Sequence, residues 1–133
     1  MWTEILFFDS ALPDSATPPA CAQGVAGAWA EFRGCVRADE KGKRITALNY
    51  EIYDALARRQ LEAHFAELAA LHGLVAGRLW HRRGLVPVGE TAIYAAVAAL
   101  HRQEAFAALT ALMDRLKTDV PIWKIDALAA PAP

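Results

Sequence analysis

Arg115-Leu-Lys-Thr-Asp-Val-Pro-Ile-Trp-Lys124 is the stretch from which the rest of the sequence is best interpreted. A helix cannot continue through Pro121, because proline has no backbone N–H and disfavours the helical conformation in the residue before it. The stretch therefore joins the end of an amphipathic helix to a short extended segment, and residues 121–123 are expected to be buried or docked. Lys117 and Lys124 consequently stand on two different backbone elements, and solubility alone does not explain lysines at these positions.

Two helices are predicted from apolar spacing. The helix that ends in the quoted stretch begins at about Gln103, and its apolar stripe is either core or a protein interface. This stripe contains Phe106, Leu109, Leu112, Met113 and Leu116. An earlier helix is expected to start at Asp54 as its cap, to run to about Leu71 and to end at Gly73, with Leu61, Phe65 and Leu68 on its apolar side.

Strands are predicted where β-favouring residues or alternating patterns occur, at residues 2–8, 27–37, 45–52, 74–80 and 91–100. The strands over 27–37 and 45–52 are expected to pair as a hairpin around a mobile, polar loop whose charges serve solvation. Residues 91–100 are rich in alanine and could form a helix by propensity. We favour a strand there because apolar residues alternate and because Pro87 and Gly89 mark a turn just before it.

The order of strands, helix, strands and helix predicts an α+β domain with helices on a mostly antiparallel sheet. A chain of 133 residues, 55% hydrophobic and 22% charged, fits one domain over 1–133 with a packed core. The formal net charge of −1 provides no overall attraction to nucleic acid or to an anionic membrane. Any anion site must therefore be a local cluster of cations.

Cys21 and Cys35 form no CxxC pair, and no signal peptide is recognised, so a reduced cytoplasmic protein is expected. No stretch approaches the ~20 apolar residues that a membrane span requires. The histidines lack the spacing of a zinc motif, and each is interpreted as structural; they are His64, His72, His81 and His101. No metal and no cofactor are predicted.

Several cations lie where predicted elements end, and functional groups tend to gather where loops converge. They are Arg37, His81, Arg82, Arg83, His101, Arg102, Lys117 and Lys124. Arginine matches phosphate with two donors, and a lysine desolvated beside other cations can act as acid, base or nucleophile. Each residue taken singly is more simply a solvated or ion-paired side chain, so spacing alone does not establish a site.

Motifs in a fixed order resemble the catalytic (large) subunit family of molybdopterin synthase. They span 27–124 and comprise Gly27-Ala28, Phe32-Arg-Gly-Cys-Val-Arg37, Leu48-Asn-Tyr-Glu51, Tyr53, His81-Arg82, Gly84, Val88-Gly-Glu90, His101-Arg102, Ala105-Phe106, and Lys117 with Pro121-Ile-Trp-Lys124. Singly they are weak, but as an ordered set they are specific. The remaining residues form an N-terminal strand and Pro-rich loop over 1–26 and a short tail over 125–133.

The resemblance implies an α+β hammerhead-type fold and a homodimer that forms a heterotetramer with a small ubiquitin-like sulfur carrier. The carrier ends in Gly-Gly with a C-terminal thiocarboxylate, whose sulfur passes to cyclic pyranopterin monophosphate (precursor Z) to form the dithiolene of molybdopterin. By the same resemblance, Lys117 and Lys124 are catalytic. The resemblance also implies that Arg37, His101 and Arg102 bind the substrate phosphate or line the pocket, with the His-Arg pair donated across the dimer interface.

The chain departs from the family pattern at Ile125-Asp126 and in its Pro-rich segment, where a short helix would be expected, and Arg33 has no assigned role. The rival interpretation is a non-catalytic homologue that only binds a ubiquitin-like partner. Retention of both Lys117 and Lys124 favours the enzyme, because a binding module needs an apolar surface but not two lysines at a pocket. A nucleic-acid binder is disfavoured by the balanced charge.

Overall fold

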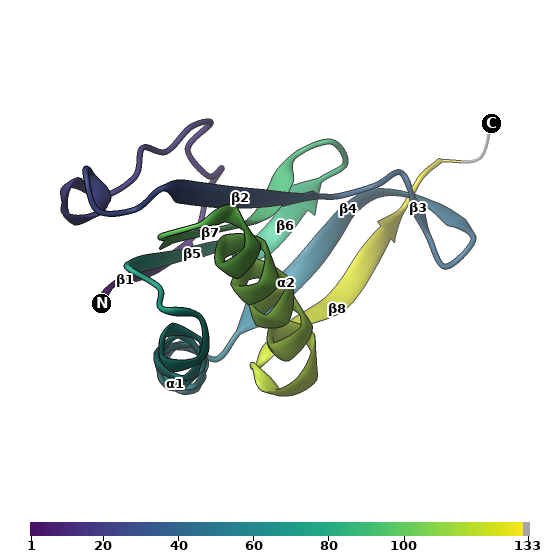
Figure 1. Cartoon of the computed structure of the whole chain (residues 1–133). Helices are drawn as coiled ribbons and strands as arrows, with labels where there is room; N and C mark the ends of the chain where they lie inside the picture. The colour runs from purple at the N-terminus through teal and green to yellow at the C-terminus, as the bar shows by residue number, and fades with distance from the viewer. Residues whose placement is uncertain (132–133) are drawn as a thin grey trace.

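The computed structural model describes residues 1–131, which form two sheets and two long helices (Figure 1). The elements are β1 (Trp2–Phe8), the 3-10 turn η1 (Ala20–Ala22), β2 (Ala28–Cys35), β3 (Asp39–Glu40), β4 (Lys43–Ile52), α1 (Asp54–His72), β5 (Ala76–Arg82), β6 (Gly84–Pro87), β7 (Thr91–Ala99), α2 (Arg102–Asp119) and β8 (Ile122–Ala129). The first sheet has the order β1-β5-β7-β2. The second has β4 between β6 and β8, with the short β3 pairing with the start of β4.

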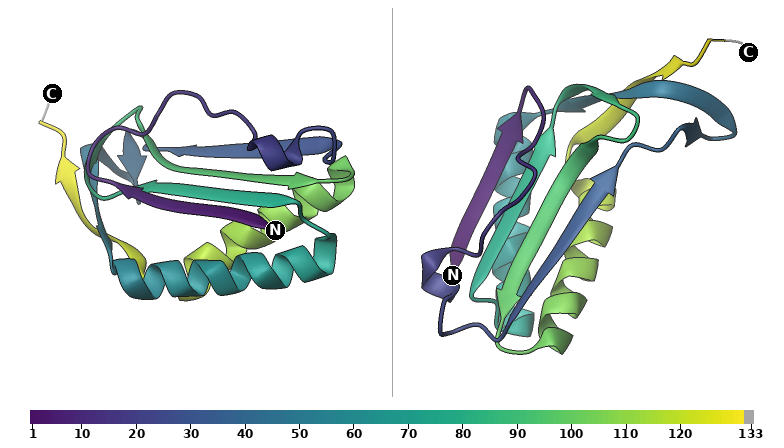
Figure 2. Two further views of the ribbon diagram at one scale, coloured as in Figure 1. Left: turned by 90° about the vertical axis from the view of Figure 1, so that its left-hand side faces the viewer. Right: turned by 90° about the horizontal axis from the view of Figure 1, so that it is seen from above.

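The larger sheet is antiparallel apart from the parallel pair of β1 and β5. Both helices pack on one face, and the segment before β2 covers the other face (Figure 2, left). The alanine-rich residues 91–100 form the strand β7, as predicted, and every residue from Ala92 to Ala99 is buried. Burial on both faces explains the small side chains, because they let the covering layers approach closely.

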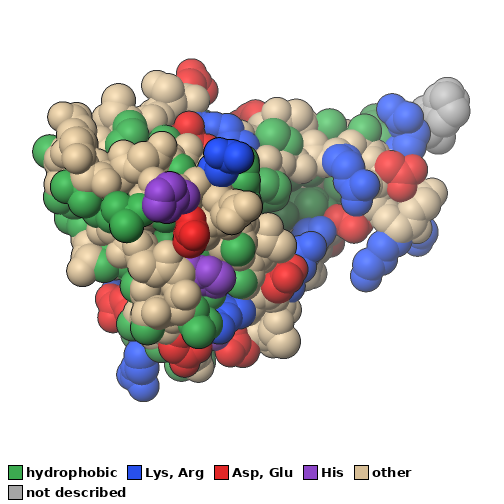
Figure 3. All heavy atoms as spheres, viewed as in Figure 1, with side chains coloured by type: hydrophobic (Ala, Val, Ile, Leu, Met, Phe, Trp, Pro, Cys, Tyr) green, Lys and Arg blue, Asp and Glu red, His purple; other side chains and the backbone are tan. Residues whose placement is uncertain are grey.

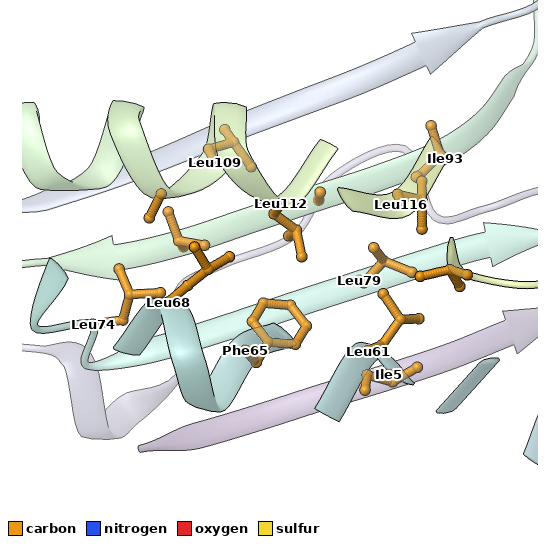
Figure 4. Close-up of a cluster of buried hydrophobic side chains, with 14 of the residues drawn as sticks. Ile5, Leu61, Phe65, Leu68, Leu74, Leu79, Ile93, Leu109, Leu112 and Leu116 are labelled. Carbon is orange, nitrogen blue, oxygen red and sulfur yellow. The ribbon is translucent and has the colours of Figure 1, made fainter. Parts of the chain in front are cut away.

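The main core lies between the two helices and the larger sheet (Figure 4). Leu61, Phe65 and Leu68 of α1 and Leu109, Leu112 and Leu116 of α2 are buried there against Leu79 and Ile93. Gly77 of β5 is required by this packing, because a Cβ at that position would lie 2.4 Å from the Phe65 ring. The apolar stripe of α2 is core over its C-terminal half, whereas Phe106 is 62% exposed.

The start of α1 differs from the prediction. Tyr53 is the cap residue and Asp54 the first helical residue, so Asp54 is not the cap. Its carboxylate instead accepts two hydrogen bonds from Arg83, at 2.6 and 2.7 Å, and these bonds hold the pKa of Asp54 below its usual value. The predicted end of the helix is confirmed, because Gly73 takes the left-handed conformation with φ of +67°.

The expected hairpin between the strands over 27–37 and 45–52 is wrong. β2 pairs with β7 across the larger sheet, whereas β4 pairs with β6 and β8 in the smaller one. Val36 marks the crossing between the sheets, since it is buried with Ile45 and Leu48 in a separate core. The expected mobile loop is a tight β3–β4 turn, with positive φ at both central residues, 41 and 42.

The N-terminal loop, residues 9–27, is held against the sheet by two arginines. Arg33, which had no role by sequence, donates hydrogen bonds to two loop carbonyls and lies 4.7 Å over the ring of Tyr94. Arg78 bonds to Glu4 at 2.9 Å and to the Thr17 carbonyl at 2.7 Å. Its guanidinium also packs against the indoles of Trp2, Trp29 and Trp80.

The Pro-rich segment contains one helical turn, η1, as the sequence allowed.

The segment predicted as a tail over 125–133 continues β8 to Ala129 and pairs with β4, while 132–133 lie outside the described residues. The expectation that residues 121–123 are buried holds for Pro121, and Ile122 is half-buried. Trp123 is 46% exposed and contacts Tyr53 edge-on, with ring centroids 4.9 Å apart. An exposed pair of aromatic rings therefore marks the start of β8.

Candidate functional site

A hollow of about 500 Å³ lies between the β3–β4 turn and β8. It is lined by Glu40, Lys41, Lys43, Arg44, Ile45, Leu48, Lys124, Ile125, Asp126, Ala127 and Ala129. Lys and Arg side chains gather at this end of the molecule (Figure 3). Lys124 thus lies in a depression that the folded chain forms between the β3–β4 turn and β8.

Cations outnumber anions around the hollow. Four of its lining residues, Lys41, Lys43, Arg44 and Lys124, are cationic, whereas Glu40 and Asp126 are acidic. The Lys124 ammonium donates a hydrogen bond to the Glu40 carboxylate at 3.2 Å, and the Lys124 side chain remains 53% exposed. Buried Ile45 and Leu48 contribute apolar wall. The arrangement suits an anionic ligand that also has an apolar part.

Lys117 lies in the last turn of α2, on the other side of Pro121 from Lys124. The junction between α2 and β8 is fixed in place, because Val120 is buried and the backbone N–H of Tyr53 donates to the Pro121 carbonyl at 3.1 Å. Lys117 is exposed, forms no ion pair within residues 1–131, and does not line the hollow. The two lysines therefore flank one rigid junction on separate elements, as predicted.

The other predicted site residues divide between two ends of the molecule. Arg37 is exposed two residues before β3, close in sequence to the wall of the hollow. His101 and Arg102 are exposed at the start of α2. Fifteen residues separate Arg102 from Lys117, which at 1.5 Å per residue is ~22 Å along the helix. One chain therefore does not bring His101 and Arg102 to Lys117.

Three further cations from the sequence cluster belong to the scaffold. His81 is buried, and this burial lowers its pKa to about 4, while Nδ1–H donates to the Arg82 carbonyl. The side chains of Arg82 and Arg83 pair with Glu90 and Asp54 respectively. Local ion pairs account for Arg82 and Arg83, and burial accounts for His81, as expected for each of these residues taken singly.

The model of the MoaE protein family matches residues 11–119. The chain belongs to the MoaE family. The matched range starts earlier than the motif set over 27–124 and includes Lys117 but not Lys124, and the roles of both lysines stay predictions. Membership confirms the resemblance recognised from the ordered motifs.

Curated relatives of this MoaE-family chain carry the name molybdopterin synthase catalytic subunit. The relative from Oryza sativa subsp. indica is 43% identical over 99 residues, which is 74% of this chain and 51% of the relative. The relative from Thermoplasma volcanium is 39% identical over 103 residues, 77% of this chain and 75% of the relative. The chain thus spans about half the length of the rice protein that it matches.

Solved structures share the fold. The molybdopterin biosynthesis MoaE protein from Burkholderia ambifaria superposes with a TM-score of 0.81 at 26% identity, over 98% of this chain and 91% of that one. A protein–protein complex of subunits 1 and 2 of molybdopterin-converting factor from Helicobacter pylori matches with a TM-score of 0.67 at 26% identity, over 84% and 75%. The predicted α+β class, with helices on a mostly antiparallel sheet, is confirmed.

Sequence reasoning on this MoaE-family chain missed Glu40 and the cations of the β3–β4 turn. Their charges were interpreted as solvation, but Glu40 bonds to Lys124 and the cations line the hollow. A local signal was present in Gly42, because glycine readily takes the positive φ that a tight hairpin turn requires. The pairing of β4 with β8, which brings Lys124 to this turn, has no local signal.

Residues 1–131 contain neither a metal-binding cluster nor a membrane-spanning helix. No group of three or more His, Cys, Asp or Glu residues that could hold a metal ion occurs within the part of the chain that is described. None of the helices in residues 1–131 has the length and apolarity needed to cross a membrane. Cys21 and Cys35 are both free and exposed.

Proposed function

We propose that this protein is the catalytic subunit of a molybdopterin synthase. In this reaction, sulfur passes from the C-terminal thiocarboxylate of a small ubiquitin-like carrier to cyclic pyranopterin monophosphate, and the dithiolene of molybdopterin forms. The observation that carries the proposal is the pair of lysines at the junction of α2 and β8, with Lys124 lining a cationic hollow. The names of the curated relatives support the same reaction.

The lysines suit this chemistry. Release of sulfur from a thiocarboxylate develops negative charge at the tail carbonyl, and fixed cationic donors stabilise such charge. Lys117 on the helix would lie nearest the inserted tail, and Lys124 would serve the substrate and proton transfer. Arg37, close in sequence to the hollow, would bind the substrate phosphate with its planar fork. No cofactor is required of the protein in this scheme.

The distribution of the remaining site residues supports a homodimer. His101 and Arg102 lie ~22 Å from Lys117 along α2, so a site that uses all of them needs the pair from a second copy. Exposed Phe106 and Leu100 near the start of α2 offer apolar surface for that contact. With one carrier on each subunit, the assembly is a heterotetramer, and light scattering of the complex tests this stoichiometry.

The carrier needs a docking surface beside the hollow. Five large apolar side chains that are at least 40% exposed lie on β6, on β8 or just after β4, namely Tyr53, Leu85, Trp123, Ile125 and Leu128. Exposed aromatic residues are frequent anchors at protein interfaces. The Helicobacter structure, a complex of two subunits, supports a partner of this kind.

We also propose that the protein acts in the cytoplasm as one domain over 1–133.

The decisive experiment mixes the protein with thiocarboxylated carrier and precursor Z and measures molybdopterin. We expect product from the unmodified protein and at least a 100-fold lower rate from Lys117→Ala and Lys124→Ala, because each removes a fixed charge at the reacting groups. Arg59→Ala, which removes an exposed cation of α1, is the matched control and should retain the full rate.

The rival function, a homologue that only binds the carrier, predicts a different outcome. The protein would then form the complex but make no molybdopterin, and both lysine variants would bind the carrier unchanged. Unmodified rates from folded, carrier-bound Lys117→Ala and Lys124→Ala would refute the assigned roles even if the wild type is active.

A further inference from the structure

A buried histidine joins the end of α2 to α1. His64 of α1 is 8% exposed, and its Nε2 lies 2.7 Å from Oδ1 of Asp119, the last residue of α2. Arg115 of α2 lies 3.3 Å from His64 Nδ1 and also pairs with Glu67 of α1. Four polar side chains thus connect the two helices next to the α2–β8 junction.

The neighbours of His64 determine which nitrogen carries its proton. A guanidinium can only donate hydrogen bonds, so Nδ1 accepts from Arg115. Nε2 therefore carries the hydrogen and donates it to the Asp119 carboxylate. The ring serves as a bridge with one defined orientation, and removing it leaves the last turn of α2 without its contact to α1 at residue 119.

Lys117 lies on the opposite side of α2 from this bridge. Arg115 and Asp119 face α1, and Lys117 is two residues from each of them, which is ~200° around a helix of 3.6 residues per turn. Lys117 therefore projects to the side of α2 away from α1. We propose that His64 is a positioning residue for Lys117, holding the rotation of the last turn of α2 through Asp119. This inference rests on the sulfur-transfer function proposed above.

A small rotation of the last turn of α2 would displace the Lys117 side chain far enough to affect catalysis. Side chains on a helix reach ~5–6 Å from its axis, so a rotation of the last turn by ~20° would move the tip of Lys117 by ~2 Å. Misplacement of a catalytic group by ~1 Å can reduce turnover about 100-fold. A loosened helix end would therefore reduce kcat by roughly 10- to 100-fold, while KM would change little because the hollow is formed by other elements.

The test uses the full chain with thiocarboxylated carrier and precursor Z. We expect His64→Ala and Asp119→Ala to lower kcat by the same factor and the double variant to be no worse, because both remove one bridge. His64→Gln, whose amide can donate to Asp119, should recover most of the rate. Asp114→Ala removes an exposed α2 carboxylate that forms no ion pair in the described residues, and it should leave kcat unchanged.

Hydrogen exchange of the amides in residues 115–119 provides a readout that does not depend on activity. Protection there should fall in His64→Ala and remain in Asp114→Ala. The inference is overturned if kcat of Asp119→Ala equals that of the wild type, or if the variants raise KM and lower kcat together with a general loss of protection. If the wild type makes no molybdopterin, the proposed function fails, and unchanged protection of residues 115–119 would separately overturn the positioning role.

Discussion

Burial of His81 as a neutral ring makes the stability of the fold depend on pH. The side chain is 4% exposed, donates from Nδ1 to the Arg82 carbonyl at 2.8 Å and contacts the ring of Tyr50. Desolvation lowers its pKa from 6.5 to about 4. Between these values the unfolded chain binds a proton that the folded chain does not bind. The free energy of unfolding therefore falls as the pH decreases from 6.5 to 4.

The size of this effect follows from the shift. A change from 6.5 to about 4 corresponds to about 3 kcal/mol at 1.36 kcal/mol per pKa unit, nearly all of it lost once the pH reaches 4. At pH 4.5 the expected loss is about 2.5 kcal/mol. Domains are stable by only about 5–15 kcal/mol, so this single ring accounts for a large share.

The assay compares wild type with His81→Phe, which keeps a ring against Tyr50 but cannot titrate. Urea unfolding followed by circular dichroism at pH 7.5, 5.5 and 4.5 gives the free energy at each pH. We expect the variant to be about 1 kcal/mol less stable at pH 7.5, since it loses a hydrogen bond, and to be the more stable protein at pH 4.5. His101→Phe, at an exposed histidine, is the control and should follow the wild type. Equal losses in wild type and His81→Phe would refute the reasoning.

Three other perturbations test the packing and the site. Gly77→Ala should cost about 1–3 kcal/mol by overpacking, and Phe65→Leu in the same chain should recover part of that loss in urea unfolding, because it removes the ring that the new Cβ meets. Arg78→Ala should speed proteolytic cleavage in the N-terminal loop, since that side chain bonds to a loop carbonyl and packs on three indoles. Glu40→Gln should reduce kcat/KM for molybdopterin formation by no more than about fivefold, because its ion pair with Lys124 is half-exposed and worth at most about 1 kcal/mol.

Local patterns predicted most elements of this fold correctly. The end of α1 at Gly73 followed from the conformational freedom of glycine, and the strand β7 followed from alternation and the turn before it. The pairing of strands could not be predicted in the same way. β2 was assigned to the strand that follows it in sequence, but its partner is β7, more than 50 residues later. Tertiary packing decides such partners. Val36, which follows β2, is buried in the core of the smaller sheet, so the chain after β2 joins that sheet and does not fold back on β2.

The candidate site was predictable only in part. The break at Pro121 indicated that Lys117 and Lys124 stand on separate elements, and the family resemblance supplied their roles. The contact of Lys124 with Glu40 depends on β8 lying along β4, which no local pattern reveals. Arg102 and Lys117 lie at opposite ends of α2. The expectation that cations at element ends converge did not distinguish the two ends of this helix.

The distribution of tryptophans supplies the protein with its own optical probes. The chain has four, and three of them surround Arg78, away from the smaller sheet. Trp123 alone lies on β8, and it is 46% exposed beside Tyr53. A variant with phenylalanine at the other three positions would report fluorescence from this end only. Docking of a carrier there would shift the Trp123 emission to shorter wavelength and shield it from iodide quenching, so binding could be followed without any label.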